Sequence, residues 1–198
     1  MAAEQNRPDV AGRRRNHMIA ARFVDPGSLV FLDETGARTN MTRLYGRSAV
    51  GERCVDHTPH GHWKTMTLLS AMRLDGVMRD ATVVYDGPMN RDTFVAYVEH
   101  ELAPALRPGD VVVMDNLSSH KDPAVRGLIE SAGADLWYLP AYSPDLNPIE
   151  KLWSKAKAWL RRVMAHTFEG VVAAIAQALS AADSTECAAY FRACGYGQ

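Results

Sequence analysis

Two short runs of residues limit the folds open to this chain, because every position in them is apolar. Leu29 to Leu32 and Val111 to Met114 are each four residues long, too short for a helix and typical of a strand. A strand that is apolar on both faces is buried between two layers. The chain is therefore expected to fold as an α/β protein, around a sheet that helices cover on both sides.

Weaker patterns extend that sheet. The turn signal Thr35-Gly36 is expected to end the first strand, and a hairpin signal at Asp75-Gly76 joins the next two. Further strands are expected at 65–73, 81–85 and 136–139, with a weaker candidate at 53–55, and helices at 90–108, at 123–132 and from Asn147 onward. The predicted order is three antiparallel strands, then alternating helix and strand, then helices.

Size and composition fit one domain. The chain has 198 residues, 47% of them hydrophobic, and a formal net charge of −1, so the totals do not suggest a strongly basic nucleic-acid binder. Three cysteines at irregular spacing argue against a disulfide framework and favour a reducing compartment. No apolar run approaches a membrane span, and the N-terminus lacks a signal-peptide core. We therefore expect a cytoplasmic protein with no membrane partner.

The N-terminal residues 1–27 are expected to form a basic extension ahead of a domain at 28–198. Five arginines face only two acidic residues in the first 22 positions, and Pro8 suits the first turn of a short helix. A solvated extension and a phosphate-contacting one both remain open.

Each apolar run ends in an aspartate, Asp33 after the first and Asp115 after the second. The carboxyl ends of neighbouring parallel strands meet at one crevice. Carboxylates held that close repel each other unless a cation lies between them. Either aspartate alone is readily explained as a turn former, but the pair favours a metal site.

A third acid, Glu150, stands at the start of a predicted helix. Asn147 suits the N-cap, Pro148 the first helical position and Glu150 the third, which is the pattern of a capping box. The same placement would also aim a metal ligand. An apolar stripe from Ile149 to Val163 would pack that helix on the sheet.

These motifs together resemble those of DDE transposases. They are Asp33-Glu34-Thr35-Gly36, then Val113-Met114-Asp115-Asn116 with His120, then Tyr142-Ser143-Pro144-Asp145-Leu146-Asn147-Pro148-Ile149-Glu150. The 34 residues between Asp115 and Glu150 resemble the spacing in the mariner-like superfamily and in related bacterial insertion-sequence transposases. The resemblance extends from about Ser28 to Arg162.

The resemblance implies a ribonuclease-H-like fold, with a mixed five-stranded sheet flanked by helices. It also implies metal-dependent DNA cleavage and strand transfer, with Asp33, Asp115 and Glu150 as the catalytic and metal-binding triad. Two Mg²⁺ ions, with Mn²⁺ as a substitute, are the expected cofactors. We expect Asp33 to bridge both ions while Asp115 and Glu150 each favour one.

Several cationic side chains are candidates for contacts with DNA. Five basic residues face one acidic residue between 147 and 166, although such a stripe is also typical of a solvated helix face. The predicted nucleic-acid-binding residues are Lys64, His120, Lys151, Lys155 and Arg162. The group His57, His60 and His62 lacks a matching second pair of zinc ligands, so a turn that meets solvent or DNA is favoured over a zinc site.

The expected partners are double-stranded DNA, both transposon ends and target, and a second copy of the chain on that DNA. Transposases of this group usually carry a helix-turn-helix region, which is expected to be separately encoded or missing. The location would then be bacterial cytoplasm, on the nucleoid when bound to DNA. An inactive DNA-binding module derived from a transposase and another ribonuclease-H-like nuclease are the alternatives. The helices expected at 168–179 and 185–194 could complete the core or form a dimer, and we favour the core.

Overall fold

A computed structural model describes residues 3–58, 60–117 and 119–197. Five strands form one sheet in the order β3-β2-β1-β4-β5. They are β1 (Leu29–Arg38), β2 (Thr65–Arg73), β3 (Gly76–Asp86), β4 (Val111–Met114) and β5 (Asp135–Tyr138). The first three pair antiparallel, and β4 and β5 add in parallel beside β1, so the predicted mixed sheet is confirmed.

Strand β1 is longer than the sequence predicted. The expected stop at Thr35-Gly36 is wrong, because β1 stays paired with β2 as far as Arg38, which lies opposite Thr65. Gly36 itself is paired with Thr67. A long antiparallel ladder on one edge thus outweighs the local preference of a glycine for a turn.

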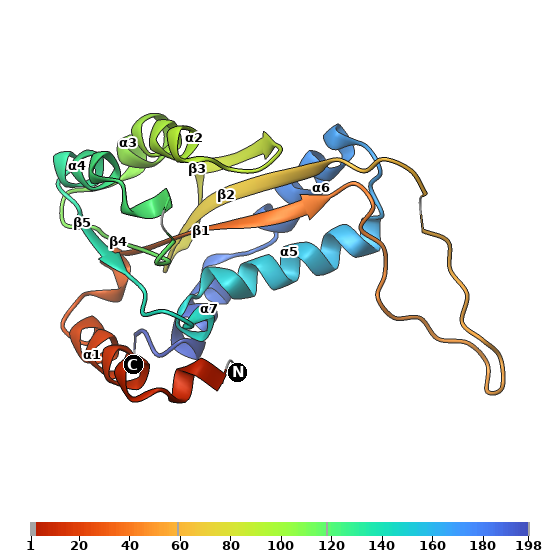
Figure 1. The fold of residues 1–198 in the computed structure, drawn as a ribbon, viewed down its shortest axis with the longest axis horizontal. Coiled ribbons are helices and arrows are strands. Elements are labelled where there is room, and N and C mark those ends of the chain that lie inside the picture. The colour runs from red at the N-terminus through yellow and green to blue at the C-terminus, as the bar shows by residue number, and fades with distance from the viewer. Residues whose placement is uncertain (1–2, 59, 118, 198) are drawn as a thin grey trace.

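Helices cover both faces of the sheet. On one side lie α2 (Arg91–Tyr97), a π-helical turn (Val98–Leu102), α3 (Ala103–Ala105) and α4 (Pro123–Ser131); on the other lie α5 (Ile149–Val163), α6 (Phe168–Ser180) and α7 (Ser184–Ala193). Figure 1 shows α2, α3 and α4 grouped together, with α5 running beneath the sheet.

The alternation of side chains along β1 explains its apolar sequence. Leu29 and Phe31 join the core beneath α5, α6 and α7, whereas Val30 and Leu32 join the core beneath α2 and α4. All four are fully buried. The predicted burial of this strand on both faces is confirmed.

Residues 39–64 connect β1 to β2 and extend away from the rest of the molecule (Figure 1). The strand predicted at 53–55 is absent, since the described part of this connection contains no strand. Val55 is exposed and has no neighbouring strand on which to pack.

Helices α6 and α7 complete the core, as expected. Val171, Ile175 and Phe191 are buried in the cluster that includes Phe31, and the Phe191 and Phe31 rings pack edge to face with centroids 5.2 Å apart. No helix in the described ranges is long and apolar enough to cross a bilayer.

The N-terminal residues form a 3₁₀ turn (Ala3–Asn6) and helix α1 (Pro8–Ala21). Pro8 occupies the first turn, as its fixed φ angle favours. Val10 and Ala21 are buried, and His17 lies 2.9 Å from the hydroxyl of Tyr196. The helix is therefore packed against the C-terminal part of the chain.

Candidate active site

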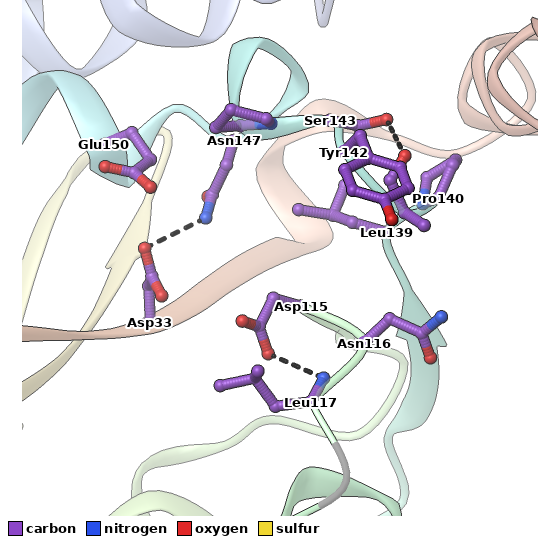
Figure 2. A pocket seen from close by; sticks show the side chains of 12 residues that line it. Asp33, Asp115, Asn116, Leu117, Leu139, Pro140, Tyr142, Ser143, Asn147 and Glu150 are labelled. Atoms are coloured by element: carbon purple, nitrogen blue, oxygen red, sulfur yellow. Dashed lines mark hydrogen bonds between the residues drawn. The ribbon is translucent and has the colours of Figure 1, made fainter. Parts of the chain in front are cut away.

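The parallel pairing of β1 with β4 sets the first two acids side by side. Phe31 lies opposite Val113 in that ladder, and Asp33 and Asp115 each follow two residues later. Both line one cavity of about 460 Å³, where Figure 2 shows their side chains pointing toward the same space. The predicted convergence is confirmed, although Asp33 lies within β1 and not at its end.

Glu150 reaches the same cavity from the first turn of α5. The predicted capping box is wrong, because Pro148 is the N-cap and makes no side-chain cap bond. The amide of Asn147 instead donates from Nδ2 to Oδ2 of Asp33, over 3.2 Å (Figure 2). The amide nitrogen thus serves the buried carboxylate, and Oδ1, the atom that would have capped the helix, has no hydrogen-bond partner among the described residues.

Two residues that hold Asp33 have a role that the sequence did not predict. Trp153, assigned to the apolar stripe of α5, donates from Nε1 to Oδ2 of Asp33 over 3.2 Å. Asn147, assigned to the helix cap, shares that oxygen. Both lie in the segment that carried the family resemblance, but local spacing alone gave no sign that either reaches β1.

Burial makes the charge of Asp33 costly. Asp33 is only 7% exposed. Burial, and after it the charges of Glu150 and Asp115, raises the pKa of its carboxyl to about 8. The backbone N–H of Glu34, 2.8 Å from Oδ1, acts in the opposite direction. Burial likewise raises the pKa of the Glu34 carboxyl.

No lysine or arginine is among the described residues that line this cavity. The three carboxylates therefore face one another without a cationic side chain between them. Oxygen ligands of this kind suit Mg²⁺ and Mn²⁺, and Oδ1 of Asn147 is a further buried oxygen with no hydrogen-bond partner. The chemistry of the donor set thus fits divalent cations.

The carboxylates do not form a closed cage. In the part of the chain that the structure describes, no three His, Cys, Asp or Glu side chains gather tightly enough to hold one ion by themselves. Magnesium commonly takes one or two carboxylates and keeps several waters. An open arrangement of three acids fits this coordination and would leave coordination positions on the ion for a phosphate.

His120 supports Asp115 from behind. Its Nδ1 lies 2.6 Å from Oδ1 of Asp115, and its ring stacks on Phe94 with centroids 4.2 Å apart. The side chain is 2% exposed, so the predicted contact with DNA is wrong for this residue. Its place makes it an orienting group for Asp115.

The predicted cationic residues lie outside the catalytic cavity. Lys155 contacts Glu186 and donates to the carbonyl of Ala181 over 2.9 Å; its contact with DNA stays a prediction. Lys64 is 3.3 Å from Asp86.

Two other cations lie on α5 itself. Lys151 directly follows Glu150, and Arg162 lies over the ring of Trp159 at 5.8 Å. Lys151, Lys155 and Arg162 lie along one side of α5, as the sequence predicted.

The histidines of the loop remain apart from the site. His57, His60 and His62 are exposed in the projecting connection, and the described residues supply no cluster of ligands there. Nothing in the structure assigns them a role.

A mixed sheet with acids from two central strands and a covering helix defines the ribonuclease-H-like fold, as predicted. Within that class, the chain belongs to the DDE superfamily endonuclease family, whose model matches residues 28–171. No curated protein matches the chain.

Solved structures with this fold include complexes of the Mos1 transposase. The Mos1 paired-end complex with left transposon end matches with a TM-score of 0.78 and 21% identity, over 98% of this chain and 60% of that one. The Mos1 mariner paired end complex with Mn matches at 0.72 and 21%, over 94% and 59%. The catalytic domain of Mos1 mariner transposase matches at 0.62 and 18%, over 98% and 90%. This chain thus spans about 60% of the transposase in the first complex.

Proposed function

We propose that residues 28–198 form the catalytic domain of a transposase, which cleaves DNA strands with divalent metal ions and joins the freed end to target DNA. The observation that carries this proposal is the meeting of Asp33, Asp115 and Glu150 in one cavity that no lining cation neutralises. Membership of the DDE superfamily endonucleases supports the reaction class.

In this proposal Asp33, Asp115 and Glu150 would together hold the metal ions. Such ions would supply activation of the attacking water or 3′-hydroxyl and stabilisation of the leaving oxygen. The chain itself keeps the ligands in place. Asn147 and Trp153 fix the Asp33 carboxylate, and the His120 ring lies against that of Asp115.

Supercoiled plasmid is the substrate for the direct test, since it requires no knowledge of the transposon ends. We expect nicking with Mg²⁺ or Mn²⁺ and none with a chelator. DNA binding without nicking at any metal concentration would favour the inactive module, and preference for an RNA strand would favour another ribonuclease-H-like nuclease.

A second cavity of about 460 Å³ offers a path for the DNA backbone. It shares Asn116 and residues 139–141 with the catalytic cavity, and α1 forms its other wall with Arg13, Asn16 and His17. Arg13 and Asn16 are exposed there. We propose that a strand leaving the site follows this groove, with a phosphate beside Arg13.

Arg13→Glu is therefore expected to weaken DNA binding about tenfold and to lower the salt slope of binding by about 1. The measurement is fluorescence anisotropy of a labelled duplex across a salt series. Arg7→Glu is the matched control, because Arg7 is exposed, pairs with Asp9 and lies outside the groove. Equal losses in the two variants would contradict the groove.

The proposed homodimer draws support from the projecting connection 39–64. It carries large exposed apolar side chains, among them Leu44 and Tyr45, the latter 90% exposed, which a second copy of the chain would cover. We expect light scattering to give the mass of two chains plus the DNA, and Tyr45→Ser to shift the assembly toward one chain per DNA. A dimer of unchanged strength in that variant would rule out this surface.

Recognition of transposon ends is proposed to need a helix-turn-helix region besides these 198 residues. Among the α5 cations, Lys151 and Arg162 are proposed to add backbone contacts, as is Lys64. We propose a bacterial, nucleoid-associated location in the cytoplasm for an enzyme with this substrate.

A further inference from the structure

The loop between β5 and α5 delivers two groups to the metal site. Asn147 ends this loop and donates to Asp33, and Glu150 follows in the first turn of α5. Any movement of residues 142–147 would therefore shift both groups. What holds this loop decides how well the site is formed before an ion arrives.

The second half of the loop is a 3₁₀ turn (Pro144–Leu146) held by its own backbone bonds, but the first half begins with a strained residue. Tyr142 has a φ angle of 57°, a left-handed conformation that is unfavourable for a residue with a side chain. Such a residue persists only where its surroundings hold it. The Tyr142 end of the loop thus depends on contacts from elsewhere in the chain.

Those contacts come from the N-terminal segment, more than 130 positions away in the sequence. Arg14 of α1 makes a two-pronged ion pair with Asp145, through bonds of 2.9 and 2.6 Å. Gln5 donates to the carbonyl of Tyr142 over 2.7 Å and to Asp145 over 3.1 Å. The strained residue and the acid beside it are therefore both held from α1 and the turn before it.

A third contact reaches the end of the loop. The hydroxyl of Tyr196 donates to the carbonyl of Leu146 over 2.8 Å and lies 2.9 Å from His17 of α1. Leu146 directly precedes Asn147. The N-terminal segment thus acts directly on the loop at positions 142 and 145, while Tyr196, which His17 contacts, holds position 146.

Asp145 itself does not line the catalytic cavity. It points toward α1, so its place in the motif is not explained by contact with an ion or with DNA at the site. An ion pair in which both side chains are partly exposed, 20% for Arg14 and 43% for Asp145, contributes little to overall stability. Its effect is expected where it acts, on the geometry of the loop.

We propose that Arg14 and Gln5 are positioning residues of the metal site, which fix the loop 142–147 through Asp145 and the Tyr142 carbonyl. The inference rests on the proposed function, since it concerns the ions that Asp33, Asp115 and Glu150 hold. Groups that orient metal ligands change metal affinity by about 10- to 100-fold when they are removed. Helix α1 thereby supports the catalytic domain from outside residues 28–198.

The test measures Mn²⁺ binding without DNA, from the rise in thermal stability along a Mn²⁺ titration of the full chain. Arg14→Glu is expected to raise the Mn²⁺ concentration at half-effect at least about tenfold, with the metal-free melting temperature little changed. Asp145→Asn, which keeps the side-chain shape, is expected to act in the same direction. Arg7→Glu is the matched control and should follow the wild type.

The reversed pair Arg14→Glu/Asp145→Arg supplies the decisive comparison, because it restores an ion pair of opposite polarity. We expect it to recover most of the lost Mn²⁺ affinity. An unchanged midpoint in both single variants, or no recovery in the reversed pair, would overturn the inference while leaving the proposed function standing. A wild type that gains no stability from Mn²⁺ would overturn both.

Discussion

Asp115→Asn is expected to abolish Mg²⁺-dependent DNA cleavage while leaving the fold intact. The loss should exceed about 10³-fold, or about 4 kcal/mol in transition-state free energy, because a neutral amide replaces a carboxylate at the proposed ion site. The side chain is 34% exposed and its shape is preserved, so the core is undisturbed. Plasmid nicking and a circular dichroism melt measure the two effects.

Asp135→Asn is the matched control for that variant. Asp135 is exposed at the opposite end of the parallel strands, where β5 begins beside Val111. The Asp135→Asn variant should cleave DNA as the wild type does. Retained cleavage in Asp115→Asn would remove Asp115 from the triad, and loss of both cleavage and folding would make its role structural.

The second large effect is on stability, and it depends on pH. Without metal, the chain should lose stability as pH rises from about 4 to about 8. The pKa of Asp33 is 3.8 in its ordinary state and about 8 when buried beside Glu150 and Asp115. Within this window the folded protein binds a proton at Asp33 that the unfolded chain has released, so the free energy of unfolding falls by up to about 1.4 kcal/mol per pH unit.

Thermal melts at pH 5 and pH 8, with and without Mn²⁺, measure this effect. Mn²⁺ should restore stability chiefly at pH 8, where it replaces the proton. Asp33→Asn should flatten the pH dependence and lose the response to Mn²⁺, whereas Asp135→Asn should retain both. A metal-free wild type as stable at pH 8 as at pH 5 would contradict the buried charge.

The sequence predicted the parts of this fold that depend on local pattern. Leu29–Leu32 and Val111–Met114 are apolar on both faces because helices cover both faces of the sheet. The convergence of Asp33 and Asp115 followed from the pairing of such strands. A fully apolar run predicts a buried strand, and an acid directly after such a run predicts a site beside the sheet.

The unpredicted parts depend on partners far along the chain. The extension of β1 past Gly36 needs β2, and the true role of Asn147 needs a carboxylate 114 positions away. The contact of Lys155 with Glu186 could not be predicted either, because Glu186 lies 31 positions further on. Local capping and charge rules cannot register such contacts.

The distribution of the site along the chain has a consequence for synthesis. Asp33 emerges from the ribosome early, but Asp115 joins it only after β4 pairs with β1, and Glu150 only after α5 forms. Pairing across such a sequence separation is a late event in folding. A polypeptide that stops before residue 150 therefore lacks one of the three carboxylates that line the cavity.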